Sequence, residues 1–171
     1  MFELFYHPIY TYGIDKRSRF PRDRYRLTKE ALDQLDVDIH FVRPRMAEIN
    51  DLYFAHDRAY VDSFLNGSLS IKERRKIGLQ PWNDQIIDRT RYIIGGSLGA
   101  LESAIASNGI AGNMAGGTHH AHYSEGSGYC IFNDLAICAK VARRNYERIN
   151  NVLIIDLDVH QGDGTASMLS N

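Results

Sequence analysis

The sequence predicts an α/β fold, with a largely parallel sheet flanked by helices. Short apolar runs alternate with longer amphipathic segments along the chain, in the order strand, helix, strand, helix, strand. The run NVLIIDLDVH (151–160) begins as an unbroken apolar stretch, which is typical of a central strand in a parallel sheet. The length of 171 residues, with 44% hydrophobic side chains, suits one domain over 1–171 with its own core.

Strands and helices are expected in turn over the first part of the chain. The runs MFELFY (1–6) and DIHFVRP (38–44) are short and apolar, and each stops near a proline, so we predict two strands. Between them, RFPRDRYRLTKEALDQL (19–35) has apolar side chains at helical spacing and predicts a helix. Helical pieces are expected over 46–67, and the charged stretch 68–82 is expected to form an irregular, exposed connection.

The clearest helix is predicted over 83–109. Asn83 can cap its start, and Asn108 followed by a glycine can end it. Three glycines inside the helix each cost about 1 kcal/mol relative to alanine, so we expect another part of the chain to approach there. They are Gly95, Gly96 and Gly99.

Two elements are expected after this helix. The run IAGNMAGG (110–117) predicts a short buried strand that leads into a polar loop. A second helix is predicted over 133–150, starting at Asn133-Asp134 and carrying basic residues towards its C-terminal end.

The bulk composition excludes several classes of partner. With 20 basic and 21 acidic side chains the formal charge is −1, so direct binding to nucleic acid or to an anionic membrane is not expected. The N-terminus does not resemble a signal peptide, and the apolar runs are too short to cross a bilayer. Cys130 and Cys138 are expected to be reduced thiols of a cytoplasmic protein.

Polar residues gather after two of the predicted strands. AGGTHHAHYSEGSGYC (115–130) places His119 beside His120, and VLIIDLDVHQGDGT (152–165) ends an apolar run with acids and a third histidine. In open α/β sheets the ligand site lies beyond the carboxyl ends of the strands, which is where both clusters are expected.

The second cluster is a candidate metal site. In an extended chain Asp156, Asp158 and His160 project to one side. Oxygen and nitrogen ligands from Asp158 and His160 suit Zn²⁺ best and Fe²⁺ next, but a catalytic zinc site needs three protein ligands and only two are evident. The alternative is that these are ordinary loop, cap and turn residues.

The paired histidines are candidates for proton transfer. One imidazole can take a proton from a metal-bound water at neutral pH, and a second can stay charged or protonate the leaving group. Each needs a carboxylate on its far nitrogen, and Asp156 and Asp163 are available. Alternatively, the histidines are solvated loop residues. Tyr129 either lines a substrate channel or packs on the core as a loop aromatic.

The motifs GGTHHAHYSEGSGYCIFNDLAI (116–137) and VLIIDLDVHQGDGT (152–165) closely resemble the zinc-dependent histone deacetylase family, including its bacterial acetoin-utilization and class IV-like members. The resemblance implies the arginase–deacetylase fold. It also implies hydrolysis of the acetyl amide of a lysine side chain or of another small acylated amine.

The resemblance also implies a role for each site residue. His119 and His120 match the acid/base pair, and Asp156 and Asp163 match the acids that orient them. Asp158 and His160 match zinc ligands. Further matches are Gly128 and Tyr129 with the wall of the acyl-lysine channel, and Asp156, Asp158 and His160 with a K⁺ site.

Members of the family continue beyond the point that matches Asn171, and there they carry a third zinc ligand and a tyrosine that polarises the acetyl carbonyl. We therefore expect the N-terminal portion of a deacetylase catalytic domain, inactive as a 171-residue chain alone. The strand over 152–156 would then lie at an exposed sheet edge, through which the chain could self-associate.

Other interpretations remain at this point. The stretch KIGLQPW (76–82) contains no acid where many relatives carry an aspartate that grips the substrate backbone, which makes protein substrates less favoured. One alternative is a non-catalytic, truncated remnant of a deacetylase that acts as a binding module. Another is a metal-dependent hydrolase of the arginase type.

Overall fold

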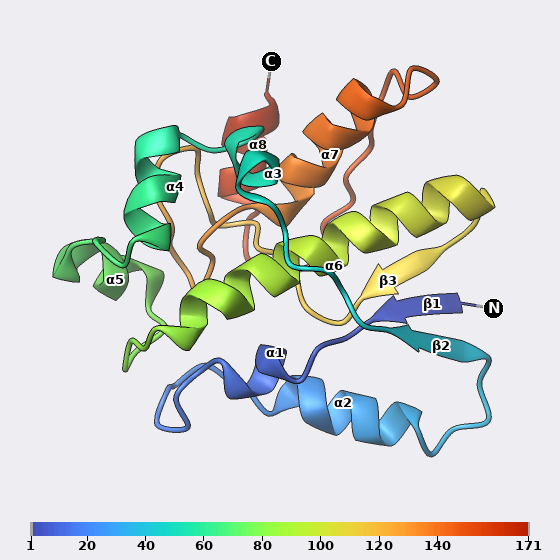
Figure 1. Cartoon of the computed structure of the whole chain (residues 1–171), viewed down its shortest axis with the longest axis horizontal. Helices are drawn as coiled ribbons and strands as arrows, with labels where there is room; N and C mark the ends of the chain where they lie inside the picture. The colour runs from blue at the N-terminus through green and yellow to red at the C-terminus, as the bar shows by residue number, and fades with distance from the viewer. Residues whose placement is uncertain (1, 171) are drawn as a thin grey trace. The chain divides into compact units, whose positions relative to one another are not determined.

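A computed structural model describes residues 2–170 (Figure 1). The chain divides into two compact units. The first unit contains Met1–Ala47 and Leu79–Gly116, and the second contains Glu48–Gly78 and Gly117–Asn171. The expectation of one domain over 1–171 stays a prediction.

The first unit is built on a three-stranded parallel sheet in the order β2-β1-β3. The strands are β1 (Phe2–Phe5), β2 (Ile39–Val42) and β3 (Ala111–Asn113). In the register Phe5 lies between Val42 and Asn113. All three short strands lie where the sequence predicts them, and the parallel sheet confirms the expected fold class.

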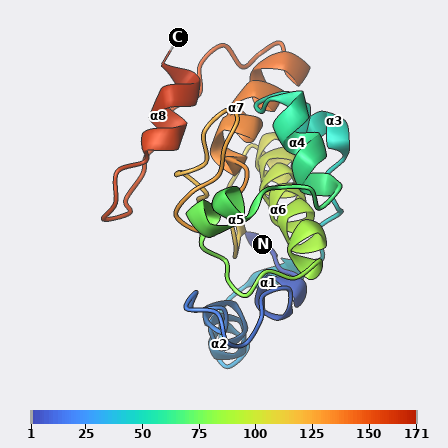
Figure 2. The same cartoon turned by 90° about the vertical axis from the view of Figure 1, so that its left-hand side faces the viewer.

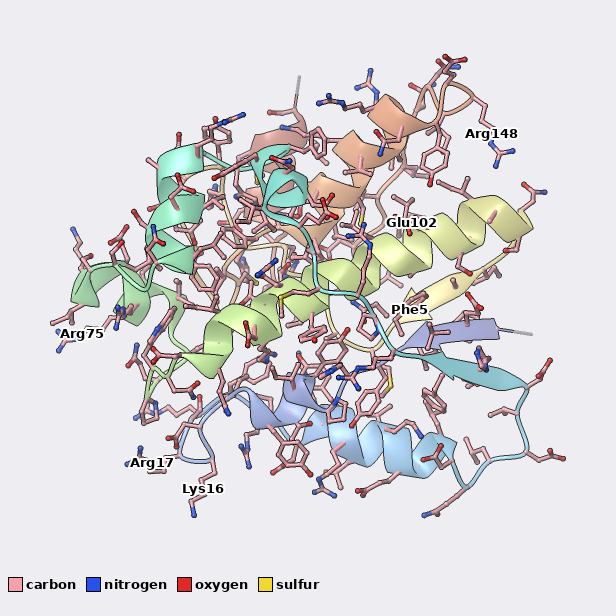
Figure 3. The ribbon with its side chains drawn as sticks, viewed as in Figure 1. Phe5, Lys16, Arg17, Arg75, Glu102 and Arg148 are labelled. Atoms are coloured by element: carbon pink, nitrogen blue, oxygen red, sulfur yellow. The ribbon has the colours of Figure 1, made fainter. Side chains whose placement is uncertain are left out.

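Helices cover both faces of this sheet. They are α2 (Arg24–Leu32) and α6 (Gln85–Ser107), while α1 (Ile9–Tyr12) packs against both helices. Figure 3 shows Phe5 at the end of β1 next to α6. On the opposite face Leu4 pairs with Phe41, and Lys29 of α2 places its ammonium 4.0 Å from the Phe41 ring centroid. Since successive residues of a strand point to opposite faces, the two helices enclose the sheet.

The glycines of α6 allow other residues to approach it closely, as predicted. A Cβ added to Gly95 would lie 1.9 Å from the Arg45 carbonyl oxygen, and one added to Gly99 would lie 2.5 Å from the Phe5 ring. The helix ends at Asn108 with a left-handed φ of 48°, as expected, but the N-cap position is Asp84 rather than Asn83, and the Asp84 side chain makes no capping hydrogen bond. Asn83 is therefore one residue too early to be the N-cap.

The second unit consists of helices and loops around an aromatic core. The helices are α3 (Ile49–Tyr53), α4 (Arg58–Leu65), α5 (Ile71–Ile77), α7 (Asp134–Asn145) and α8 (Asp163–Leu169). The Phe132 ring lies 5.0 Å from His56, 5.5 Å from Tyr60 and 5.1 Å from Phe64, between ring centroids. Figure 2 shows α8 beside α7 within this unit.

Helix α5 corrects the prediction of an irregular connection over 68–82. Ser70 accepts a hydrogen bond from the Glu73 backbone, and the Glu73 carboxylate accepts one from the Ser70 backbone at 2.7 Å. This capping box supplies partners for otherwise unpaired amides at the helix start. Lys72, Arg75 and Lys76 of this helix are exposed, and Arg75 points outward (Figure 3).

The predicted strand over 152–156 is wrong for the structure described here, because residues 151–158 form no assigned strand. The odd-numbered aliphatic side chains over 153–159 are exposed, with Leu157 at 92% and Val159 at 93%. An unbroken apolar run predicts burial, but a parallel strand also needs hydrogen-bonding neighbours on both sides. Among the described residues no strand pairs with this segment.

No helix in the described part of the chain combines the length and the apolar character needed to cross a membrane.

Candidate active site

In the second unit the histidine loop, residues 117–123, is hydrogen-bonded to the start of α7. The Asp134 carboxylate accepts hydrogen bonds from the backbone of Gly117 (3.2 Å) and Thr118 (2.8 Å) and from the Thr118 hydroxyl (2.7 Å). The same hydroxyl accepts the Asp134 amide at 3.1 Å. Asp134 is buried, so this reciprocal arrangement fixes the backbone immediately before His119.

Two adjacent histidines are each paired with their own carboxylate. His119 Nδ1 lies 2.7 Å from Asp156 Oδ2, and His120 Nδ1 lies 2.8 Å from Asp163 Oδ1. The two imidazole rings are 4.2 Å apart between centroids. His119 is only 5% exposed, whereas the His120 side chain retains 22% of its exposure. The structure thus brings together four residues that lie up to 44 positions apart in sequence.

The pairings determine which ring nitrogen carries the proton. Hydrogen bonding to His119 lowers the pKa of Asp156, and hydrogen bonding to His120 lowers the pKa of Asp163. Both carboxylates are therefore ionised acceptors at neutral pH, and each histidine donates through Nδ1. In the neutral imidazoles this leaves Nε2 as a lone-pair acceptor that can take a proton.

Asp158 and His160 lie next to the paired histidines. Asp158 Oδ1 accepts the His160 amide at 2.8 Å and lies 3.0 Å from His160 Nδ1. Hydrogen bonding to the His160 backbone is the main cause of the lowered pKa of Asp158. The His160 ring is 5.9 Å from that of His120, so His119, His120, Asp158 and His160 converge in the second unit.

Asp158 and His160 bring an oxygen and a nitrogen donor close together. Bonds of about 2.0–2.1 Å at a tetrahedral zinc place two donor atoms about 3.3 Å apart, close to the 3.0 Å between Asp158 Oδ1 and His160 Nδ1. Within residues 2–170, however, no group of three or more His, Cys, Asp or Glu side chains could hold a metal ion together. Asp158 and His160 supply an oxygen and a nitrogen donor of the kind that zinc takes, and metal binding by them stays a prediction.

Glycines make room for the two His–Asp pairs. A Cβ on Gly162 would lie 2.5 Å from Asp156 Oδ2, and one on Gly128 would lie 2.6 Å from the His120 ring. Gly128 also has a left-handed φ of 53°, as does the following Tyr129 at 68°. The Tyr129 amide donates to the Ile77 carbonyl at 2.7 Å, and its side chain is 40% exposed. Gly128 thus lies against His120, with Tyr129 beside it at the surface.

Several residues near the site are not predicted from the sequence to belong to it. His122 lies against Asp163, with its Nε2 3.5 Å from Asp163 Oδ2, and its Nδ1 lies 2.9 Å from the Ser167 hydroxyl. His56, Asn133 and Thr165 form a buried polar group behind the histidine loop. The sequence signal for Asn133 is its position before α7, where its side chain accepts the Ala136 amide at 3.0 Å. Nothing local in the sequence indicates that the three residues meet.

The fold and the site together define an α/β protein in which two adjacent histidines are held by carboxylates. The sequence matches the histone deacetylase domain over residues 18–171, and the chain belongs to the histone deacetylase family, a family of deacetylase-type hydrolases. This match favours a deacetylase over a hydrolase of the arginase type.

Three relatives show how much of a longer protein the chain represents. It is 39% identical to an uncharacterized protein of Picosynechococcus sp., covering 96% of this chain and 55% of that protein. It is 34% identical to the acetoin utilization protein AcuC of Staphylococcus aureus (90% and 42%) and 29% identical to that of Bacillus subtilis (93% and 43%). The chain therefore spans about half the length of the curated relatives it matches.

Proposed function

We propose that the polypeptide containing this chain hydrolyses the acetyl amide of a lysine side chain or of a related small acylated amine. The observation that carries the proposal is the pair of adjacent imidazoles, each donating through Nδ1 to its own carboxylate. This leaves two Nε2 atoms available for proton transfer at one place. The histone deacetylase domain supports an acylated amine as the substrate class.

The two histidines divide the proton transfers. His119 takes a proton through Nε2 from a water as the water oxygen attacks the acetyl carbonyl carbon. His120 remains protonated through this step and delivers a proton to the amine nitrogen as the C–N bond breaks. Acetate and the free amine are the products. Asp156 and Asp163 hold the imidazoles in the required tautomer and balance the charge that develops on them.

Asp158 and His160 would hold the metal in this proposal, with Zn²⁺ favoured and Fe²⁺ as the alternative. Bound there, the metal would supply Lewis-acid polarisation of the carbonyl and a lower pKa for the attacking water. The Asp158 carboxylate is ionised at neutral pH and can serve as an oxygen ligand, since hydrogen bonding to the His160 backbone lowers its pKa further. A K⁺ ion at Asp156, Asp158 and His160 also remains a proposal.

The substrate and the setting complete the proposal. Gly128 and Tyr129 would form the wall against which the acyl chain lies, because they stand next to His120. The absence of an acid over 76–82 in the sequence favours small acylated amines over protein substrates.

We also propose a cytoplasmic location and, through the exposed aliphatic residues of 152–159, self-association of the 171-residue chain.

A second candidate is a non-catalytic binding module. It is favoured by one observation, that the described residues contain no group of three metal ligands. In that case the His–Asp pairs would bind an acylated amine without cleaving it.

Acetate release distinguishes the two candidates. The product of the complete reading frame, stripped of metal and reloaded with Zn²⁺ or Fe²⁺, is expected to release acetate from an acetyl-lysine peptide or an acetylated polyamine. Chelation should stop the release and added metal should restore it. The 171-residue chain alone is the matched comparison and is expected to release none. Binding of both substrates without acetate release in any metal-loaded form would support the binding module instead.

A further inference from the structure

A buried hydrogen-bonded group lies behind the histidine loop, outside the residues that the proposed reaction uses. It consists of His56, which is 1% exposed, together with Asn133 and Thr165. His56 precedes α4, Asn133 caps α7 and Thr165 belongs to α8. Three helices of the second unit therefore meet through these side chains.

His56 is held in one tautomer by its two partners. The backbone amide of Asn133 donates a hydrogen bond to His56 Nε2 at 2.9 Å, so Nε2 carries no hydrogen. Nδ1 then carries the hydrogen and donates it to the Tyr123 carbonyl at 3.2 Å. The ring thus links the end of the histidine loop to the start of α7.

The side chain of Asn133 is hydrogen-bonded both to the histidine loop and to α8. Its Nδ2 donates to the Ala121 carbonyl at 3.1 Å and to the Thr165 hydroxyl at 3.0 Å. The Thr165 amide in turn donates to the His119 carbonyl at 3.1 Å. Consequently the backbone at His119 and Ala121 is held by Thr165 and Asn133, and the backbone of Asn133 is in turn hydrogen-bonded to His56.

The start of α8 lies directly against the same backbone. A Cβ on Gly164 would lie 2.3 Å from the Ala121 carbonyl oxygen and 2.6 Å from that of His119. Gly164 follows Asp163, the partner of His120. A shift of the loop relative to α8 would therefore separate His120 from its carboxylate.

We propose that His56 is a positioning residue, which fixes the histidine loop relative to α8 through Asn133 and Thr165. The inference rests on the proposed function for the catalytic meaning of His119 and His120. The positioning itself is a property of the fold and does not depend on catalysis.

The test compares three variants of the 171-residue chain by NMR. His56→Phe keeps an aromatic ring against Phe132 but removes both hydrogen bonds of the imidazole. In His56→Gln the side-chain oxygen of glutamine can still accept the hydrogen bond from the Asn133 backbone amide. Tyr60→Phe is the matched control, because it removes a buried hydrogen bond from the same aromatic core, that of the Tyr60 hydroxyl to the Ile131 carbonyl at 2.9 Å.

Two readouts report on the loop and need no enzymatic activity. They are the exchange rate of the Thr165 amide hydrogen and the tautomer of His120 from its ring ¹⁵N shifts. In His56→Phe we expect exchange at Thr165 to be at least about tenfold faster and the Nδ1–H tautomer of His120 to be lost, because its partner Asp163 belongs to α8. His56→Gln should restore both readouts, and Tyr60→Phe should change neither.

Equal changes in His56→Phe and Tyr60→Phe, or wild-type values in His56→Phe, would overturn the proposal. If His56→Phe does not fold, the proposal is tested with His56→Gln instead. Slow Thr165 exchange with the Nδ1–H tautomer retained supports positioning through Asn133, and fast exchange with the tautomer lost overturns it. Since neither readout involves a substrate, failure of this inference is distinguishable from failure of the proposed deacetylation.

Discussion

Replacing His120 with alanine is expected to slow acetate release by about 10²- to 10⁴-fold in the product of the complete reading frame. The variant loses the imidazole that delivers a proton to the amine, and it leaves Asp163 without its 2.8 Å partner. The His120 side chain retains 22% of its exposure, so its removal should leave folding intact. Acetate release at saturating and at limiting substrate measures the effect on kcat and on kcat/KM.

His122→Ala is the matched control for this prediction. His122 is a loop histidine that also contacts Asp163, but at 3.5 Å and without being its closest partner. Its removal should slow acetate release by less than about tenfold. Similar losses in the two variants would show that any charged neighbour of Asp163 serves equally well, contrary to the proposed role of His120.

The free energy of unfolding is expected to fall by about 3 kcal/mol between pH 7 and pH 4 because of His56 alone. Burial lowers the pKa of His56 from its usual 6.5 to about 4, and the nearby Lys140 contributes in the same direction. Since one pKa unit corresponds to about 1.4 kcal/mol, the difference amounts to about 3 kcal/mol.

The sign follows from proton binding. Between pH 6.5 and 4 the unfolded chain protonates His56 while the folded chain keeps it neutral, so acid favours unfolding in this window. Asp156, Asp158 and Asp163 have lowered pKa values, and their contribution is lost only as the pH falls below their usual 3.8. The carboxylate contribution therefore belongs to a more acidic range.

Urea unfolding of the wild type and of His56→Gln at a series of pH values isolates this effect. Burial also lowers the pKa of His7, so the difference between the two proteins is the relevant quantity. In His56→Gln the free energy of unfolding should lack the part of its pH dependence between pH 6.5 and 4 that comes from His56. Identical slopes in the two proteins would mean that His56 is not buried as a neutral imidazole.

The sequence predicts those parts of the fold that local patterns encode. The long helix over 85–107 follows from its apolar spacing, and the close approach at Gly95 follows from a glycine in a helix interior. Helix α5 is also encoded locally, by Ser70 and Glu73, but this signal lies inside a charged stretch that resembles a solvated loop. The run at 152–156 misleads because apolar character indicates burial without specifying a strand partner.

The site is predictable to the extent that its residues lie close to one another within each motif. His119 beside His120, and Asp158 two residues before His160, are visible in the sequence, and the pairings with Asp156 and Asp163 follow from the resemblance. The roles of all these residues stay predictions. His56 lies 77 residues from Asn133, so their buried hydrogen bond depends on the packing of the second unit, which no local pattern encodes.

The central claim is that each histidine works as a unit with its own carboxylate. The most direct test is a double-mutant cycle of His120→Ala and Asp163→Ala, measured as acetate release by the product of the complete reading frame. Because Asp163 acts through the imidazole, the double variant is predicted to be at most about threefold slower than His120→Ala alone. If the two single losses multiply in the double variant, Asp163 acts independently of His120 and the claim is contradicted.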